Sequence, residues 1–219
     1  MIVTIDGPAG SGKSTAARGL AARLGFDYLD TGAMFRAVGL ALLNRGIDPA
    51  NHAAVEPVLA ELLLEMPPGR VMLDGRDVTA AIRSPAVAQA ASRVAVVPAV
   101  RRFLAAEQRR IAEGRNFVCE GRDQGTAVFP DAPCKFFVTA DPRARAARRF
   151  RELLDKGEAV TLEEVLAAQV ERDTRDAERA DAPMRAAADA VVIDTTDQTA
   201  DDVLARLEEV VRRCATART

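Results

Sequence analysis

The sequence is short of the residues that many catalytic and metal sites require. Its 219 residues include no tryptophan, one tyrosine and one histidine, His52. A single histidine argues against a histidine-based catalytic triad and against a metal site with several histidine ligands. The three cysteines, Cys119, Cys134 and Cys214, lack the short spacings of a zinc site. We therefore interpret them as reduced thiols.

Lysine and net charge are both scarce. The 30 basic residues nearly balance the 32 acidic ones, which leaves a net charge of −2. Only Lys13, Lys135 and Lys156 are lysines, and the other basic residues are arginines. No polybasic run predicts a nucleic-acid surface, so we expect no nucleic-acid partner. A coding bias accounts for many arginines, but arginine also binds phosphate through two N–H groups, so their positions matter.

Long apolar runs are missing as well. No stretch is long enough to span a bilayer, and the strand-like run from Ile2 to Ile5 begins without the pattern of a signal peptide. We therefore expect a cytoplasmic protein with no membrane partner. Hydrophobic residues make up 48% of the chain, which is enough to form the core of one domain of ordinary size.

Short apolar runs alternate with amphipathic stretches along most of the chain. The predicted strands are Ile2–Asp6, Phe26–Asp30, Phe117–Glu120, Lys135–Ala140 and Ala190–Asp194. The predicted helices are Lys13–Leu24, Thr31–Asn44, Pro98–Ala112, Pro142–Leu154, Thr161–Glu178 and Thr199–Ala215. This alternation predicts an α/β fold with a mostly parallel sheet of about five strands and helices on both faces.

The segment from Ile47 to Val97 departs from this alternation. It contains a helical stretch over Ala53–Glu65, a break at Pro67-Pro68-Gly69, and a small hairpin around the turn Asp74-Gly75. A further helix is predicted over Ser84–Val94. We interpret the segment as part of an inserted subdomain.

One motif carries the first indication of chemistry. Residues Gly7 to Ser14 match the pattern G-x-x-x-x-G-K-[ST], between a predicted strand and a predicted helix. Such a loop turns its backbone N–H groups toward phosphate oxygens, with the lysine on the β- and γ-phosphates and the serine hydroxyl on Mg²⁺. The alternative is a glycine-rich turn with no ligand. We expect ATP to contact Gly7, Pro8, Ala9, Gly10, Ser11, Gly12, Lys13, Ser14 and Thr15.

Other features separate the classes of protein that share this loop. A regulatory GTPase needs an Asn-Lys-x-Asp segment, and the chain has no Asn-Lys pair. A motor or transporter ATPase needs an apolar strand that ends in a magnesium-binding Asp, whereas Phe117–Glu120 ends in Glu120-Gly121. A small-molecule kinase remains. It must hold two anions together, and the arginines suited to this are Arg36, Arg101, Arg122, Arg172, Arg175 and Arg179.

Several runs in order along the chain resemble bacterial cytidylate kinases, which are P-loop nucleoside monophosphate kinases. They are DTGAMFR from Asp30, Ala91-Ser92 with Arg101, GRDQGTAVFPDA from Gly121, and ERDTRD from Glu171 with Arg179 and Pro183. The resemblance covers almost the whole chain. It implies one domain over residues 1–219, with a nucleoside monophosphate (NMP)-binding insert over about 31–100 and a helical lid over about 148–180.

The resemblance also implies the reaction. Such an enzyme phosphorylates CMP and dCMP with ATP and Mg²⁺, gives CDP and dCDP for pyrimidine nucleotide metabolism, and acts as a monomer. Ser14 would be the one protein ligand of Mg²⁺. The residues implied in catalysis are Lys13, Arg36, Arg122 and Arg172.

Roles in binding CMP follow from the same resemblance. Ser92, Arg101 and Asp123 match positions that read the cytosine edge. Positions that hold the acceptor phosphate match Arg36 and Arg122, and those near the sugar match Arg172 and Asp176. Thr31 and Arg179 complete the implied CMP site. Among the lid arginines, Arg148 and Arg149 are the weaker candidates for ATP.

The residues leave alternatives open. Arg36 alone could be a surface arginine, and the charges from Arg172 to Asp176 could be a solvated helical ladder. Phe35 replaces the usual tyrosine and Gln124 an apolar residue, so the preference among CMP, dCMP and UMP stays open. Rival hypotheses are a uridylate or shikimate kinase, and a nucleotide-binding module without turnover.

Overall fold

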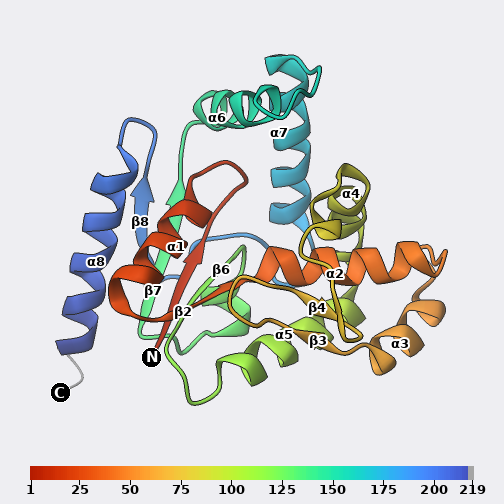
Figure 1. Ribbon diagram of the computed structural model, residues 1–219. Helices are drawn as coiled ribbons and strands as arrows, with labels where there is room; N and C mark the ends of the chain where they lie inside the picture. Colours follow the sequence, from red (N-terminus) through yellow and green to blue (C-terminus); the bar gives the residue numbers. More distant parts are fainter. Residues whose placement is uncertain (217–219) are drawn as a thin grey trace. The chain divides into compact units, whose positions relative to one another are not determined.

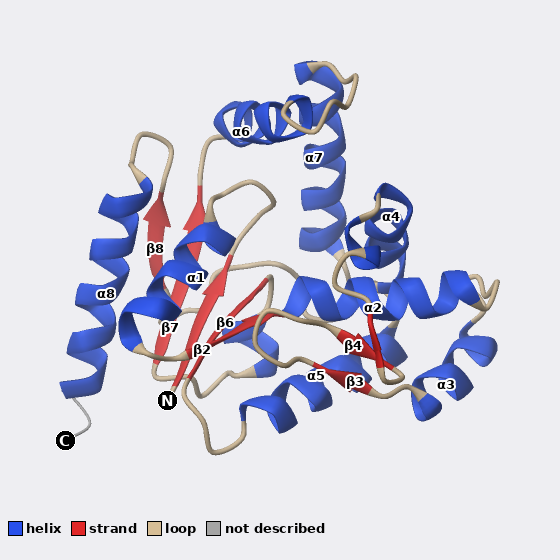
Figure 2. Cartoon of the chain, viewed as in Figure 1, coloured by secondary structure: helices blue, strands red, loops and turns tan. Residues whose placement is uncertain are grey.

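The computed structural model describes residues Met1–Thr216, which fall into two units. The first unit combines Met1–Tyr28 with the chain from Asn116 onward, and the second is Leu29–Arg115. Figures 1 and 2 show their helices and strands. The predicted single domain over 1–219, of which 217–219 lie outside the described residues, stays a prediction.

A five-stranded sheet organises the first unit. Its order is β2-β6-β1-β7-β8, with β1 (Ile2–Asp6) in the centre between β6 (Phe117–Gly121) and β7 (Cys134–Thr139). β1 pairs in parallel with both neighbours, and β7 pairs in parallel with β8 (Val191–Asp194). The edge strand β2 (Asp27–Asp30) crosses the boundary between the two units. The predicted α/β sheet of about five strands is therefore confirmed, with strand ends within one residue of those expected.

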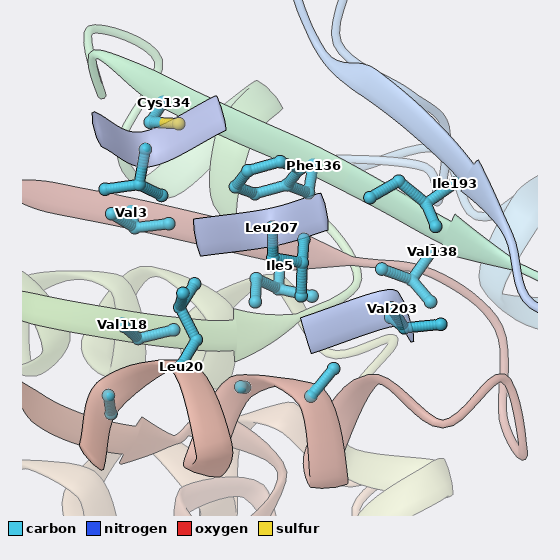
Figure 3. Packing of buried hydrophobic residues seen from close by; sticks show 14 residues of the cluster. Val3, Ile5, Leu20, Val118, Cys134, Phe136, Val138, Ile193, Val203 and Leu207 are labelled. Carbon is cyan, nitrogen blue, oxygen red and sulfur yellow. The ribbon is translucent and has the colours of Figure 1, made fainter. Parts of the chain in front are cut away.

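Helices α1 (Lys13–Leu24) and α8 (Ala200–Thr216) pack against each other and contribute to the core of this sheet. Val3 and Ile5 of β1 are fully buried, as is Leu207 of α8. Figure 3 shows these side chains together with Phe136 of β7. Small residues on α1 permit close approach, since a Cβ added at Gly19 would lie 2.9 Å from Leu204 of α8.

Two further helices of the first unit form a pair, α6 (Pro142–Leu154) and α7 (Leu162–Glu178). Asp141 caps α6 by accepting hydrogen bonds from two backbone N–H groups. Thr161 caps α7 and forms a reciprocal capping box with Glu164, which fixes the predicted start of this helix. The pair buries a small apolar cluster of its own.

The second unit consists of four helices and a small antiparallel sheet. The helices are α2 (Thr31–Asn44), α3 (His52–Glu61), α4 (Pro85–Val94) and α5 (Pro98–Ala112), with a short turn, η1 (Ala81–Arg83). Helices α2 and α4 make the closest packing. A Cβ added at Gly39 of α2 would lie 3.0 Å from the backbone nitrogen of Ala91 of α4, so glycine permits this approach.

The small sheet differs from the predicted hairpin. It has three strands, β3 (Leu64–Glu65), β4 (Met72–Leu73) and β5 (Arg76–Asp77), in that order. The expectation that the helix over Ala53–Glu65 would continue to Glu65 was wrong, because α3 ends at Glu61. Leu64 is buried and pairs with Leu73, and this partner across the sheet outweighs the local helical pattern.

Candidate phosphoryl-transfer site

The predicted phosphate loop joins the end of β1 to the start of α1. Gly7, Gly10 and Gly12 have φ values of 146°, 75° and 83°, which side chains rarely adopt. A Cβ at Gly7 would lie 2.0 Å from the carbonyl oxygen of Val138, so only glycine fits there. The first turn of α1 has no side-chain cap and no acidic residue. These features leave the helix N-terminus suited to an anion.

Lys13 is buried and turned back onto the loop. Its Nζ donates to the carbonyl oxygen of Pro8 at 3.1 Å and lies 3.8 Å from Oε1 of Glu120. Burial, assisted by the nearby charge of Arg122, lowers the pKa of Lys13 to about 7. The negative charge near Lys13 in the protein therefore does not fully offset the cost of burying its ammonium group. A bound phosphate would supply the missing negative charge.

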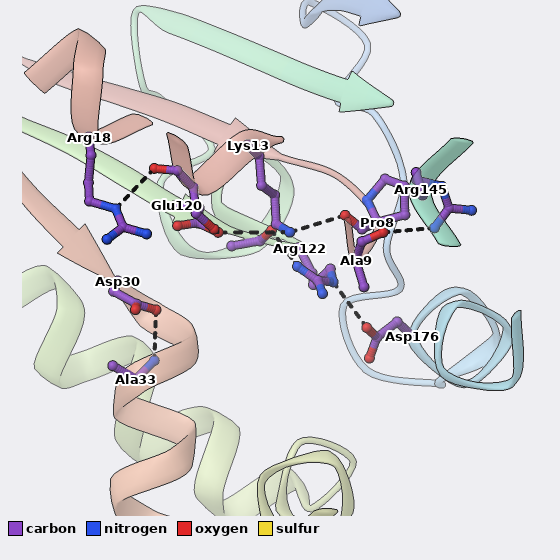
Figure 4. A network of polar contacts seen from close by, with 12 residues as sticks. Pro8, Ala9, Lys13, Arg18, Asp30, Ala33, Glu120, Arg122, Arg145 and Asp176 are labelled. Carbon is purple, nitrogen blue, oxygen red and sulfur yellow. Dashed lines mark hydrogen bonds and ion pairs between the residues drawn. The ribbon is translucent and has the colours of Figure 1, made fainter. Parts of the chain in front are cut away.

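Glu120, the penultimate residue of β6, meets both signature residues of the loop. Ser14 donates to its Oε1 at 2.6 Å, and Tyr28 donates to its Oε2 at 2.5 Å. Burial alone would raise the pKa of Glu120, but Lys13 and the two hydroxyl donors hold the pKa below its usual value. The carboxylate therefore stays charged beside Ser14, and Figure 4 shows its ion pair with Lys13. From the sequence, Glu120 served only to distinguish the chain from motor and transporter ATPases. An acid at the end of a buried strand was the signal for this contact.

Asp6 is a second acid that sequence reasoning missed. It ends β1, directly before the loop, and its two oxygens accept the backbone N–H groups of Gln124 and Gly125, each at 2.8 Å. Burial raises the pKa of Asp6 to about 7, although both N–H donors oppose this shift. Asp6 thereby fixes the backbone that follows Arg122 and Asp123, where the chain forms a π-helical turn, η2 (Gln124–Val128).

Four of the predicted CMP-binding residues come together in the first unit. Arg122 forms an ion pair with Asp176 of α7 at 3.1 Å, which is drawn in Figure 4. Arg179, directly after α7, lies 3.3 Å from Asp123 and 3.8 Å from Asp176. All four side chains are at most 15% exposed, so their charges act at short range in a largely desolvated cluster.

The helix pair α6–α7 contacts the phosphate loop through an ion pair. Asp173 accepts from the backbone N–H of Ala9 at 3.3 Å, and Arg145 donates to the carbonyl oxygen of Ala9 at 2.9 Å. Arg145 and Asp173 also pair with each other, and both are largely buried. Neither was among the predicted site residues. Arg172 is exposed on α7, and its charge helps to lower the pKa of Lys13.

The two lid arginines named from the sequence have other partners. Arg148 donates to Thr195 Oγ1 at 3.0 Å and to the carbonyl oxygen of Thr196 at 3.2 Å. Arg149 pairs with Glu152 one turn along the surface of α6. In the described residues, Arg145 is thus the α6 arginine that reaches the loop. A role of Arg148 and Arg149 toward ATP stays a prediction.

The remaining predicted residues belong to the second unit. Arg36 of α2 donates to Asp30 at 3.1 Å, and Asp30 also caps α2 by accepting from Ala33 N at 2.8 Å. Thr31, the first residue of α2, is buried. Ser92 lies on α4, whereas Arg101 lies on α5 and donates to the carbonyl oxygen of Ala95 at 3.3 Å. Helices α2, α4 and α5 therefore position these side chains within their unit.

Within residues 1–216, two other kinds of feature are missing. No described helix is both long and apolar enough to cross a membrane. No group of three or more His, Cys, Asp or Glu residues in that range is arranged to hold a metal ion. Mg²⁺ in kinase sites is typically held by one or two protein oxygens together with substrate phosphates, so the Ser14–Glu120 pair fits this kind of site.

Comparisons with known proteins point to one family. The cytidylate kinase family model matches residues 3–213. The chain is 47% identical to a cytidylate kinase of Solibacter usitatus over 97% of its own length and 92% of that protein's. It is 46% identical to a cytidylate kinase of Rhodopirellula baltica over 99% of its own length and 95% of that protein's.

A likeness to solved structures concerns the fold alone. An uncharacterized protein of Eubacterium ventriosum aligns over 98% of each chain with a TM-score of 0.52 and 13% identity. The family assignment rests on the sequence comparisons, which span nearly the whole chain at more than 40% identity. This chain belongs to the cytidylate kinase family.

Proposed function

We propose that this protein transfers the γ-phosphoryl group of ATP to CMP or dCMP, giving ADP and CDP or dCDP. The observation that carries the proposal is the cluster of Arg122, Asp123, Asp176 and Arg179, within the same unit as the phosphate loop. A loop of this kind accounts for the donor alone. The cluster supplies both a cation for an acceptor phosphate and a carboxylate for a base, as expected of a cytidylate kinase.

The donor half of the mechanism uses the loop and its first helical turn. The backbone N–H groups of Gly7 to Ser14 would bind the β- and γ-phosphates, and Lys13 would move from Pro8 to the transferred group. Ser14 and Glu120 would hold Mg²⁺ together with the phosphates, and the ion would supply neutralisation of the phosphate charge. Because a phosphate lies beside it, Lys13 would keep its proton throughout.

The acceptor half uses charge and hydrogen bonding rather than a strong base, because the attacking phosphate of CMP is already anionic. We propose that Arg122 and Arg36 hold this phosphate and that Arg172 and Asp176 bind the sugar. Asp123 would accept from the cytosine amino group, and Ser92 and Arg101 would donate to N3 and O2. Thr31 and Arg179 would complete the site.

The existing ion pairs give these residues a defined starting position. Arg122 is paired with Asp176, and Arg179 with Asp123, so no charge in the cluster is left buried alone. An acceptor phosphate would compete with Asp176 for Arg122 and release that carboxylate for the ribose hydroxyls. Closure of α6–α7 as a lid would exclude water and so limit hydrolysis of ATP.

A coupled ADP-release assay with CMP, dCMP, UMP, AMP and shikimate tests the reaction. We expect turnover to be fastest with a cytosine nucleotide and to require Mg²⁺. Equal rates with all nucleotides would overturn the cytidylate assignment, and tight ATP binding without turnover would favour a binding module. We further propose a cytoplasmic monomer without nucleic-acid or membrane partners, which sedimentation and fractionation would check.

Asp123→Ala tests the base-reading role separately. Removing a charged hydrogen-bond partner costs about 1.5–3 kcal/mol, so we expect KM for CMP to rise about 10-fold to 100-fold. KM for ATP should stay within about twofold, because the donor loop does not contain Asp123. Asp131→Ala removes an exposed carboxylate eight positions further along and serves as the matched control. Equal increases in both KM values would contradict the role.

A further inference from the structure

Two of the three cysteines lie side by side, although 80 positions separate them in the sequence. Cys134 is the first residue of β7 and is 2% exposed. Cys214 lies in the last turn of α8 and is partly buried against the same apolar cluster. The Cys214 thiol donates to Sγ of Cys134, with the two sulfur atoms 3.1 Å apart. A disulfide requires them to approach by about 1 Å more.

The packing of regular elements fixes this proximity. β7 is bonded on one side to β1 and on the other to β8, so Cys134 is anchored within the sheet. On α8, Leu207 and Val211 are buried in the core, and Cys214 follows on the same face of the helix at the i, i+4, i+7 spacing. Figure 3 shows Cys134 and Leu207 within this cluster. The apolar face of α8 thus directs Cys214 toward the first residue of β7.

The two thiols differ in their chemical accessibility. Burial, and the hydrogen bond from Cys214, raise the pKa of the Cys134 thiol far above its usual value, so Cys134 stays protonated and shielded. Cys214 is the partner that solvent can reach. An oxidant therefore meets Cys214 first, and Cys134 is placed to act as the second thiol.

We propose that Cys134 and Cys214 are a modification site that a peroxide converts into an intramolecular disulfide between β7 and α8. The peroxide transfers one oxygen to Sγ of Cys214, which gives a sulfenic acid and one water. The Cys134 sulfur then attacks the sulfenic sulfur, so the S–S bond forms as the S–O bond breaks. The thiol proton of Cys134 leaves with the hydroxyl group as a second water. Two thiols have lost two electrons and two protons, and one hydrogen peroxide has become two waters.

The bridge acts on stability rather than on the reacting groups. The disulfide closes a loop from Cys134 to Cys214 that contains α6, α7 and β8. This cross-link lowers the conformational entropy of the unfolded chain. No residue of the phosphate loop or of the arginine–aspartate cluster takes part. The oxidised protein is therefore expected to keep its kinase turnover and to resist unfolding better than the reduced one.

The test exposes the folded, full-length protein to a small excess of hydrogen peroxide, with thiols then counted under denaturing conditions. We expect one free thiol, Cys119, a mass lower by two hydrogen atoms, and a bridged peptide that holds Cys134 and Cys214. The midpoint of thermal unfolding should rise by about 5–10 °C and return to its starting value after reduction.

Three variants keep the proposal falsifiable. Cys134→Ser and Cys214→Ser should each abolish the loss of two hydrogen atoms and the rise in the unfolding midpoint. Cys119→Ser, which alters a fully buried thiol in β6, should preserve both. Three remaining thiols, sulfinic acid at Cys214, a bridge that includes Cys119, or a disulfide-linked dimer would each overturn the site. A bridge formed without a rise in the midpoint would overturn its stabilising role.

Discussion

At the scale of single residues, Asp6 presents the sharpest conflict of forces. Burial disfavours its charge, whereas two backbone N–H groups favour it, and burial prevails with a pKa of about 7 against an ordinary 3.8. Its hydrogen bonds fix the backbone of Gln124 and Gly125, immediately after Arg122 and Asp123. The free-energy cost of burying the carboxylate therefore opposes the stabilisation that its hydrogen bonds give to the backbone of Gln124 and Gly125.

This conflict predicts a pH dependence of stability. Between pH 4 and pH 7 the folded protein holds a proton on Asp6 that the unfolded chain has lost. The stability that Asp6 contributes therefore falls as pH rises through this window, by up to about 1.4 kcal/mol per pH unit. Asp6→Asn cannot titrate. Urea unfolding should be measured for both proteins from pH 5 to pH 8. The free energy of unfolding of the parent chain minus that of Asp6→Asn should fall as the pH is raised.

A comparison with a second carboxylate controls for general effects of pH. Asp131→Asn removes one exposed carboxylate and is the matched control, because its difference from the parent chain measures the general effect of losing one acid. If the free energies of unfolding of the parent chain and of Asp6→Asn differed by the same amount at every pH, a raised pKa of Asp6 would be excluded.

Sequence reasoning reached some of these residues and not others for a clear physical reason. The loop from Gly7 to Ser14 was predictable because its geometry is local. Glu120 and Asp6 act across neighbouring strands, where Ile5 pairs with Glu120 although more than a hundred residues separate them. No periodicity in one sequence indicates which strands will be neighbours, so the contact of Glu120 with Ser14 needed the fold.

At the scale of elements, the helix pair α6–α7 forms hydrogen bonds with one residue of the phosphate loop, Ala9. Arg145 and Asp173 contact the two backbone polar groups of Ala9 from different helices. A Cβ at Gly10 would also lie 2.9 Å from Gln169 Nε2 and 3.1 Å from the carbonyl oxygen of Arg145. The loop is therefore shaped by both helices as well as by its own glycines.

Asp173→Ala should weaken the donor site more than the acceptor site. The change removes a partner from the Ala9 N–H. It also leaves the largely buried Arg145 guanidinium with carbonyl oxygens as acceptors but without its carboxylate partner. Steady-state kinetics should show KM for ATP raised about tenfold, with a smaller change for CMP. Glu171→Ala, which removes an exposed carboxylate paired with Arg175 on the same helix, is the matched control.

A double-mutant cycle distinguishes a specific interaction between Arg145 and Asp173 from a general loss of structure. Arg145→Ala combined with Asp173→Ala should cost less than the sum of the two single changes, because the two side chains pair with each other. Strict additivity of the effects on KM for ATP would contradict the coupling. The helical pattern of α6 could not have singled out Arg145, since which of its several arginines faces the loop depends on how the helix packs.

At the scale of the whole molecule, the chain divides into units with separate packing. The unit Leu29–Arg115 has α2 packed on α4, and its sequence departs from the alternation seen elsewhere. In the other unit, Asp27 donates its backbone N–H to the carbonyl oxygen of Asn116 at 2.9 Å. The two points where the chain leaves and rejoins this unit are therefore adjacent, as expected for a tolerated insertion.

A shortened chain tests whether the first unit forms the donor site without the second. Residues 29–115 are replaced by a short glycine linker, which has only a small gap to span between Tyr28 and Asn116. Pro8 and Glu120, which accept hydrogen bonds from the side chains of Lys13 and Ser14, are both retained. We expect cooperative unfolding, an unfolding midpoint that ATP raises, and no turnover with CMP, because Arg36, Ser92 and Arg101 are gone.

The same shortened chain carrying Lys13→Ala separates specific binding from a general effect of the nucleotide. It should unfold cooperatively and show little or no shift with ATP, since the buried ammonium that would meet the phosphates is missing. If the shortened chain with Lys13 failed to unfold cooperatively, the first unit would depend on the second for its fold. If it folded but gave no shift with ATP, the donor site would need groups beyond those described around Lys13 and Glu120.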